Sequence, residues 1–335
     1  MRIIIPMAGW GSRLRPHTLT VPKPLIPIAG KSIVQRLVEN LSSSISTPIE
    51  EIAFIIREDF GKEIEKSLLK IASDLGTKAV ICYQNEPLGT AHAIMCASES
   101  LEGNLIVAFA DTLFKANFSL DTEADGVVWV SKIDDPSNFG VVKLDAQNVI
   151  TDFVEKPAEF ISDLAIIGIY YFRDGSYLKS ELQFLLDHQI VINGEYQLTS
   201  ALENMKLKGS KFVPGKVEEW LDCGNKNATV NTNARILEHI KHAEKLIASD
   251  VILENSVIIE PCYIASNVCI KNSIIGPHVS IGAASKIENS IVKNSIIQSN
   301  SFIGQKLINN SMVGKYVTMN GSFDDLSIGD YNQLS

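Results

Sequence analysis

The sequence has few cysteines, no long apolar run and no block of basic residues, and each absence excludes a class of protein. Its five cysteines show no paired spacing and no C-x-x-C pattern, which predicts free thiols rather than a disulfide framework or a zinc site. No apolar run approaches the roughly 20 residues that cross a bilayer. A net charge of −9 without a Lys/Arg block disfavours binding to the nucleic-acid backbone.

The start of the chain also lacks the features of a signal peptide, since Met1 and Arg2 lead directly into a strand-like run. Together with the free thiols, this predicts a cytoplasmic protein. Hydrophobic residues make up 45% and charged residues 21% of the chain, as in ordinary folded proteins. A length of 335 residues suits two domains.

Two common phosphate-binding motifs are incomplete. Counting G-x-G-x-x-G from Gly9 places Leu14 where a dinucleotide fingerprint needs a small residue. The segment 30–32, Gly-Lys-Ser, looks like the end of a P-loop, but Leu25 stands where the first glycine of that motif belongs. The sequence therefore excludes both motifs.

The glycine-rich opening is nevertheless suited to phosphate. Residues 3–5 form an apolar run, followed by Gly9, Gly11, Arg13 and Lys23. Glycines let backbone N–H groups approach a phosphate closely, and nearby cations supply the opposite charge. This pattern predicts a polyphosphate site, although an ordinary structured loop uses the same residue types and only later segments can decide.

Strand-like runs alternate with helical patterns up to about residue 240, which predicts a Rossmann-like, doubly wound, mainly parallel sheet of the α/β class. Ligands bind beyond the carboxyl ends of the strands in such sheets, so the glycine-rich turn and Asp111 are expected to share one cleft. The predicted buried strands lie at residues 3–5, 52–56, 80–83 and 105–109, and helical spacing covers residues 33–41.

Short-period repetition begins after residue 249 and predicts a parallel β-helix of about four coils. We place the domain boundary near residue 248, with an α/β domain at 1–248 that ends in a linking helix at 225–248, and the β-helix at 249–335. The repeats resemble those of left-handed hexapeptide β-helices, although several steps have only five residues. The predicted inward residues are Ile252, Ile258, Ile264, Ile270, Ile275, Ile281, Ile287, Val292, Ile297, Ile303, Ile308, Val313 and Met319.

The opening pattern G-x-G-S-R-L, followed by P-K-P, resembles the signature of sugar-1-phosphate nucleotidylyltransferases, and the resemblance continues in order to about residue 240. It is greatest to the thymidylyl- and uridylyltransferases that carry a C-terminal left-handed β-helix. The implied reaction is attack of a sugar 1-phosphate on the α-phosphorus of a nucleoside triphosphate, with release of pyrophosphate. Such a reaction depends on alignment and on charge neutralisation by Mg²⁺ and cationic side chains.

Four residues are expected to carry this chemistry. Asp111 ends an apolar strand, and Asp222 lies in a W-x-D-x-G segment that resembles the second metal-binding aspartate of the family. Two carboxylates together with substrate phosphates would satisfy Mg²⁺. Arg13 is expected to hold the β- and γ-phosphates and the departing pyrophosphate, and Lys23 the α-phosphate.

The segment 84–93 resembles the pyrimidine-reading segment of the family. The amide of Gln84 can pair with the edge of uracil or thymine, and Gly89 lets backbone approach the base. Guanylyltransferases more often carry an acidic residue at this position, so UTP or dTTP is expected, with mannose-1-phosphate guanylyltransferase as the alternative. His92 is expected to pack in a helix, and Trp10 is left out of the site. The expected nucleotide-binding residues are Ala8, Gly9, Gly11, Ser12, Arg13, Gln84, Gly89 and Thr90.

Sugar recognition is assigned by resemblance alone. Glu155 and Lys156 lie in an E-K-P segment, in which the carboxylate would accept from sugar hydroxyls and the ammonium would pair with the sugar phosphate. The expected sugar 1-phosphate is that of glucose. The full expected set is Gly140, Glu155, Lys156, Gly168 and Glu195. Ser12, Ala110 and Asn225 depart from the usual Thr, Gly and Thr of the family.

Two alternative functions follow from the same features. A non-catalytic regulatory relative would keep the fold but lose Arg13, Lys23 or an aspartate, and all of these are present. A bifunctional enzyme would use His278, the one histidine of the β-helix, as the base of an acyl transfer. The default role of the β-helix is assembly into a homo-oligomer, a dimer or tetramer. The identity of the sugar, the choice between UTP and dTTP, and regulation stay open.

Overall fold

A computed structural model describes residues 1–116 and 124–322 of the chain. Contacts divide the protein into two compact units. The first unit contains Met1–Ile26 and Ser32–Gly224, and the second contains Pro27–Lys31 and the residues from Asn225 onward. Within the described ranges, no helix is both long enough and apolar enough to cross a membrane.

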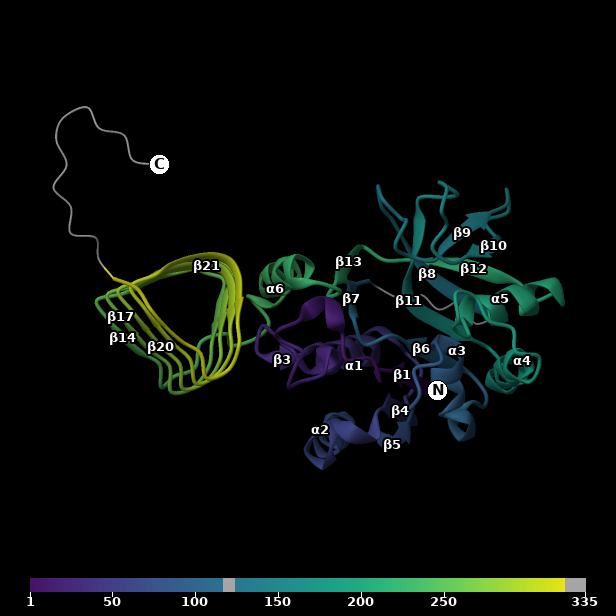
Figure 1. The fold of residues 1–335 in the computed structure, drawn as a ribbon, viewed down its shortest axis with the longest axis horizontal. Helices are drawn as coiled ribbons and strands as arrows, with labels where there is room; N and C mark the ends of the chain where they lie inside the picture. Colours follow the sequence, from purple (N-terminus) through teal and green to yellow (C-terminus); the bar gives the residue numbers. More distant parts are fainter. Residues whose placement is uncertain (117–123, 323–335) are drawn as a thin grey trace. The chain divides into compact units, whose positions relative to one another are not determined.

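The first unit is built on a nine-stranded mixed sheet in the order β10-β9-β11-β6-β1-β4-β5, with β8 and β12 continuing from β11 (Figure 1). Its centre is parallel, since β6, β1, β4 and β5 run in one direction, while β11 is antiparallel to β6. The predicted strands and fold class are confirmed. The strand bounds are β1 Arg2–Pro6, β4 Glu51–Ile56, β5 Lys78–Tyr83, β6 Leu105–Ala108, β8 Gly126–Lys132, β9 Val141–Leu144, β10 Ile150–Val154, β11 Leu164–Phe172 and β12 Phe212–Lys216.

Helices connect these strands and cover the sheet. Helix α1 begins where the Ser32 hydroxyl accepts from the Gln35 N–H, and it buries the apolar residues that the sequence placed at helical spacing. Strands β7 and β13 form a separate antiparallel ribbon. The bounds are α1 Ile33–Ser44, α2 Lys62–Asp74, α3 Thr90–Met95, α4 Gly175–Asp187, α5 Leu198–Leu207, β7 Thr112–Lys115 and β13 Glu219–Asp222, with single 3₁₀ turns at Ser12–Leu14, Lys23–Leu25, Glu58–Phe60 and Ser98–Ser100.

The second unit is a parallel β-helix with helix α6 packed against it (Figure 1). Its strands stack in register, and equivalent side chains are 16 or 17 residues apart. The aliphatic column inside the coils is buried from Ile264 to Val313. The bounds are α6 Lys226–Ile240, β14 Ile252–Glu254, β15 Val257–Ile258, β16 Cys262–Ile264, β17 Cys269–Lys271, β18 Ile274–Ile275, β19 Val279–Ile281, β20 Lys286–Glu288, β21 Ile291–Ile297, β22 Phe302–Gly304, β23 Leu307–Val313 and β24 Thr318–Asn320; β2 Pro27–Ile28 pairs with β3 Lys31–Ser32.

The five-residue steps of the repeat coincide with tight Asn-Ser corners, except that the step from Ile303 to Ile308 turns at Gln305. Asn255, Asn272 and Asn289 adopt left-handed backbone conformations with φ of 46°, 48° and 49°, which asparagine tolerates better than most residues. Their side-chain amides form a ladder of hydrogen bonds from coil to coil, at 2.9 and 3.3 Å. Departure from a strict hexapeptide is therefore compatible with regular stacking.

Two expectations for this region were wrong in detail. Helix α6 ends at Ile240 rather than near 248, because residues 246–248 extend along Ile264, which donates to Leu246 O. Ile252 is 58% exposed, and the strand register places its neighbour Leu253 in line with Ile270 instead. The domain boundary near residue 248 stays a prediction; by contacts, α6 groups with the β-helix.

Candidate active site

The glycine-rich loop after β1 folds back on the following chain. Gly11 has φ of 77°, and a Cβ there would lie 2.6 Å from Lys23 Cβ, so no other residue type fits without a shift. Its carbonyl accepts from the Thr18 hydroxyl at 2.9 Å and from the Leu14 N–H at 3.0 Å. Around a Cβ at Gly9 there would be nothing within 4 Å, so the backbone there is open to a ligand.

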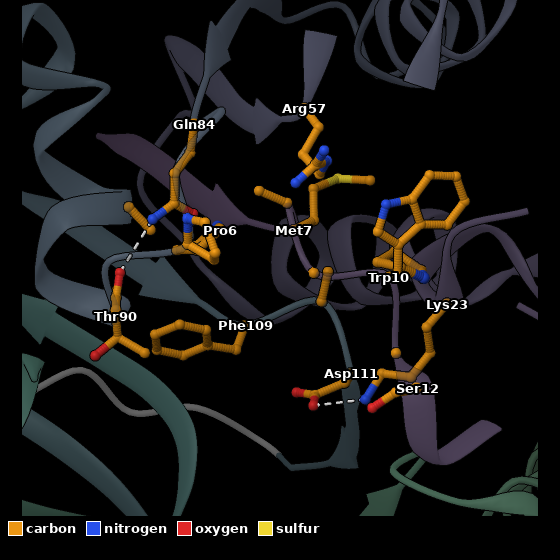
Figure 2. Close-up of a pocket in the computed structure, with 18 of the residues that line it drawn as sticks. Pro6, Met7, Trp10, Ser12, Lys23, Arg57, Gln84, Thr90, Phe109 and Asp111 are labelled. Carbon is orange, nitrogen blue, oxygen red and sulfur yellow. Dashed lines mark hydrogen bonds and ion pairs between the residues drawn. The ribbon is translucent and has the colours of Figure 1, made fainter. Parts of the chain in front are cut away.

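This loop lines a cavity of about 510 Å³ at the carboxyl ends of the central strands (Figure 2). Gln84 lies at one end of it and the Lys23–Asp111 ion pair at the other, with Thr90 and Phe109 along one side. The predicted residues on its wall are Ala8, Gly9, Gly11, Ser12, Arg13, Lys23, Gln84, Gly89, Thr90, Asp111 and Glu195. The structure therefore brings the whole expected nucleotide-binding set to one place.

A second cavity of about 220 Å³ adjoins the first, because Arg13, Thr90, Phe109 and Asp111 line both. Most of the expected sugar-binding residues lie on this smaller cavity, but Glu195 lines the larger one and Lys156 lines neither. The side chain of Lys156 is 56% exposed and lies 3.7 Å from Glu155. The predicted residues on the smaller cavity are Gly140, Glu155, Gly168 and Asp222.

Two aspartates meet where the cavities join. Asp111 Oδ2 accepts from Lys23 Nζ at 2.7 Å, and only 9% of the Lys23 side chain is exposed. Asp222 is paired with Thr112 in the β7–β13 ribbon, and the Cys223 N–H donates to Asp111 O at 3.0 Å. The ribbon therefore holds carboxylates from distant segments beside each other and beside one ammonium group.

The surroundings of Asp222 disfavour the charged form of its carboxylate. Burial raises its pKa, and the charge of Asp111 acts in the same direction. The Gly224 N–H, which donates to Asp222 Oδ1 at 2.9 Å, opposes the rise, as do Lys23 and Arg13. A cation beside both aspartates would relieve this unfavourable charge.

The donor set fits Mg²⁺ better than a metal held by protein ligands alone. Among the described residues, no three His, Cys, Asp or Glu side chains are close enough to hold an ion. Mg²⁺ commonly binds through one or two carboxylates and completes its shell with water and substrate phosphates. Asp111 and Asp222 are the residues that would hold it.

At the end of the larger cavity away from Lys23 and Asp111, the side chain of Gln84 contacts Gly89 and His92 (Figure 2). Gln84 is only 8% exposed, and its Nε2 donates to Gly89 O at 3.2 Å and lies 3.1 Å from His92 Nδ1. Gly89 has φ of 111°, and a Cβ there would lie 2.5 Å from Tyr196 O, so a glycine is required. Burial lowers the pKa of His92, which keeps the ring neutral near pH 7.

On the smaller cavity, Glu155 Oε2 accepts from the Thr199 hydroxyl at 3.5 Å. A Cβ on Gly140 would lie 3.1 Å from the same oxygen, so the strand passes close to this carboxylate. Gly168 has φ of 85°, and its carbonyl accepts from the Phe109 N–H at 2.9 Å. The lack of side chains at these two glycines leaves the cavity open beside Glu155 and Phe109.

Sequence reasoning missed several residues that line the cavities. Trp10 and Arg57 belong to the larger cavity; Trp10 packs on Phe60 with ring centroids 5.1 Å apart, and Arg57 is held by Asp59 at 2.7 and 2.9 Å. Arg57 follows β4, so the rule that ligands lie beyond carboxyl ends of strands could have identified it. Gln197, Thr199 and Trp220 line the smaller cavity without a comparable sequence signal.

The sequence model of the nucleotidyl transferase family matches residues 2–239. The chain belongs to this family. This nucleotidyl transferase is 30% identical to the bifunctional protein GlmU of Methanococcus maripaludis, over 97% of this chain and 82% of that protein. It is 26% identical to the glucose-1-phosphate thymidylyltransferase of Streptomyces antibioticus, over 96% and 94%.

The fold of the nucleotidyl transferase also has solved counterparts. A nucleoside-diphosphate-sugar pyrophosphorylase from Vibrio cholerae is similar with a TM-score of 0.60 and 21% identity, covering 69% of this chain and 99% of that one. The predicted resemblance to sugar-1-phosphate nucleotidylyltransferases and the prediction of an enzyme are confirmed.

Proposed function

We propose that the protein transfers a uridylyl or thymidylyl group from UTP or dTTP to a sugar 1-phosphate, glucose 1-phosphate first, with Mg²⁺ as cofactor. The observation that carries this proposal is the junction of the two cavities, where Arg13 and Asp111 face both. A triphosphate in the larger cavity and a sugar phosphate in the smaller one would meet beside Lys23, Asp111 and Asp222.

The edge of the base would be read at Gln84 and Gly89. Gln84 Nε2 lies against Gly89 O and His92 Nδ1, so its Oε1 is the amide atom left to meet a ligand. No described residue accepts from the N–H of Gly89, the residue that precedes helix α3 beside the same cavity. An acceptor next to a donor matches the N–H and C=O of uracil, thymine or guanine and opposes the reversed edge of cytosine or adenine.

Guanine is the alternative that this edge pattern leaves open. A glutamine rather than an acidic side chain at position 84 favours the pyrimidines, because a carboxylate would accept from both N1–H and the amino group of guanine. The relative from Streptomyces antibioticus, named as a glucose-1-phosphate thymidylyltransferase, supports the same assignment and supports glucose 1-phosphate as the acceptor.

In the reaction, an oxygen of the sugar phosphate attacks the α-phosphorus while the bond to the β-phosphate breaks and pyrophosphate leaves. Lys23 holds its ammonium group at Asp111, where it can follow negative charge on the α-phosphate. Arg13, which lines both cavities, binds the β- and γ-phosphates and releases them as pyrophosphate. Bound by Asp111 and Asp222, Mg²⁺ would supply neutralisation of phosphate charge.

The sugar would be held by groups of the smaller cavity. Glu155 would accept from sugar hydroxyls, and Gly140 and Gly168 leave room for the ring. Lys156 stays proposed as a partner of the sugar phosphate, although its ammonium would have to turn from Glu155 into the cavity. Glu195, which lines the larger cavity, would bind the sugar from there.

An acyl-transfer activity of the β-helix receives no support from the geometry. His278 Nε2 lies 2.7 Å from Glu238 and Nδ1 lies 3.3 Å from Asn294 Oδ1. With both ring nitrogens directed at acceptors, the ring is poorly placed to act as a general base. Arg13, Lys23, Asp111 and Asp222 lie together as catalysis requires, which disfavours a purely regulatory role.

Assembly into a homo-oligomer in the cytoplasm is part of the proposal. The register stacks four exposed apolar side chains on one outer face of the β-helix, Val257, Ile274, Ile291 and Leu307. Such a column is suited to contact with another subunit. Light scattering of the purified protein tests it, and a monomer at micromolar concentration would contradict it.

The decisive experiment is a grid of ATP, GTP, CTP, UTP and dTTP against glucose, galactose, mannose and N-acetylglucosamine 1-phosphates. Pyrophosphate release is measured with Mg²⁺ and with excess EDTA. We expect release with UTP or dTTP and none without Mg²⁺, and Gln84→Glu should mainly alter the choice of nucleotide. Absence of release in every combination, with folded protein, would refute the proposed function.

A further inference from the structure

The orientation of the Gln84 amide follows from its neighbours. Gly89 O can only accept a hydrogen bond, so the atom that faces it at 3.2 Å must be the amide nitrogen. The same nitrogen lies 3.1 Å from His92 Nδ1, within reach for donating its second hydrogen when that ring nitrogen carries no proton. The amide oxygen is therefore turned away from both contacts, toward the cavity that Gln84 lines (Figure 2).

The His92 ring contacts the Gln84 amide on the side away from the cavity. For Nδ1 to accept from Gln84, its lone pair must be free, so the ring is neutral with its proton on Nε2. His92 itself does not line the cavity, since the wall of α3 is formed by Thr90 and Ala93. A protonated ring would present an N–H to the amide nitrogen, and the two donors would repel.

We propose that His92 is a positioning residue for nucleotide recognition, which holds Gln84 Oε1 toward the base and so demands an N–H on the edge of that base. The inference rests on the proposed uridylyl or thymidylyl transfer. It assigns His92 no contact with substrate. Its effect should therefore appear in the KM for nucleotide and in base selectivity rather than in kcat.

The test compares His92→Leu with His92→Asn. Leucine keeps bulk but removes the acceptor, whereas asparagine can accept through Oδ1 close to the place of Nδ1. The probes are UTP or dTTP, whichever the wild-type enzyme uses faster, and the N3-methyl analogue of the same nucleotide. Methylation at N3 removes the N–H that Gln84 Oε1 would bind, so kcat/KM of the wild type should fall about 100-fold.

We expect His92→Leu to raise the KM for nucleotide about tenfold with kcat within about threefold, and to shrink the N3-methyl penalty to about tenfold because the amide can turn. His92→Asn should recover both wild-type values within about threefold. The KM for the sugar 1-phosphate should not change in either variant. A wild-type KM and a full N3-methyl penalty in His92→Leu would overturn the inference.

A pH series on the wild type gives a second, independent measurement should His92→Leu fail to fold. Protonation of the ring should raise the KM for nucleotide as pH falls from about 8 to about 5, while His92→Asn stays flat. Of the described charged groups, Glu86 acts on His92 and opposes the effect of burial. Cys96, just after α3, reaches the His92 carbonyl through its N–H and its thiol, and no hydrogen bond joins it to the ring. A flat wild-type profile would contradict the inference.

Different results would contradict the proposed function and the proposed role of His92. If the wild-type enzyme uses neither UTP nor dTTP with any sugar 1-phosphate, the proposed function is wrong. If it uses one of them while the His92 variants and the pH series leave nucleotide KM unchanged, only the role of His92 is wrong.

Discussion

The contacts that stabilise each of the two units join residues at very different separations along the chain. In the β-helix, the recurring hydrogen bonds join residues 16 or 17 apart, such as Asn255 to Asn272. In the candidate active site, the Lys23–Asp111 pair spans 88 residues and the Thr90–Gln197 bond spans 107. Stability of a repeated stack is nearly a sum of local terms, whereas the site exists only when the whole sheet has formed.

From this contrast we expect substitutions in the two units to have different effects. A change inside the β-helix should cost stability and leave the chemistry intact. A change at the junction of the two cavities should cost chemistry, and its effect on stability should depend on which charges it leaves buried.

The largest effects are expected at the two aspartates. Asp111→Asn and Asp222→Asn should each lower kcat by at least about 100-fold, because charge stabilisation at a metal is worth several kcal/mol. Pyrophosphate release under saturating substrate is the measurement. Asp74→Asn, in an exposed pair with Lys70 on α2, is the matched control and should keep wild-type turnover.

The stabilities of the two variants should differ although their activities fall together. Asp111→Asn removes the carboxylate that is ion-paired with the buried ammonium of Lys23 and should lower the free energy of unfolding by about 3 kcal/mol. Asp222→Asn removes a carboxylate whose pKa burial has raised, so it should be neutral or stabilising. Equal destabilisation in chemical denaturation would contradict this assignment of charges.

A substitution that creates a cavity inside the β-helix should lower stability and leave turnover unchanged. Ile281 is fully buried between Ile264 and Ile297 of the neighbouring coils, so Ile281→Ala should cost about 2–5 kcal/mol. Ile252→Ala, at a side chain that is 58% exposed and outside the apolar column, is the control and should cost far less. Turnover per folded molecule should match the wild type in both; a loss of kcat in Ile281→Ala would show that the chemistry depends on the β-helix core.

The same contrast explains what the sequence could predict. Along the β-helix the fold repeats at the period of the sequence, so nearly every inward residue could be counted. The exception, Ile252, lies on the first coil, where a three-residue strand offers two adjacent aliphatics and only pairing with the next coil selects Leu253. The end of helix α6 was missed for a related reason, since only pairing with Ile264 extends the chain after it.

In the nucleotidyl transferase unit, the sequence could place the four parallel strands β1, β4, β5 and β6 and the glycine-rich turn, because their signals are local. It could have placed Arg57 at the cavity, because Arg57 follows β4, but it could not show that Trp10 rests on Phe60, since that contact joins segments about 50 residues apart at the edge of the sheet. Nor could it show that the amide nitrogen of Gln84 lies against Gly89 O and His92 Nδ1.

A smaller but specific effect is expected at the glycine-rich loop. Gly11→Ala combines φ of 77° with a Cβ placed 2.6 Å from Lys23 Cβ, so it should lower stability by about 1–2 kcal/mol or more and displace Lys23. We expect kcat to fall with it. Gly9→Ala is the control for stability, because its Cβ would find nothing within 4 Å, and its thermal midpoint should equal that of the wild type. Equal midpoints for both variants would refute the packing argument.

The smallest expected effect is at the Asn-Ser corners, where two substitutions distinguish the stability cost of backbone strain from that of lost side-chain hydrogen bonds. Asn272→Ala loses both the left-handed preference, at φ of 48°, and two amide bonds of the ladder, and should cost about 1–2 kcal/mol. Asn272→Gly keeps the conformation and loses only the ladder, so it should cost less. If the ladder rather than the backbone carried the corner, glycine and alanine would destabilise equally in urea denaturation. Because a stack of coils adds local terms, Asn255→Ala and Asn289→Ala should each repeat a cost of the same order.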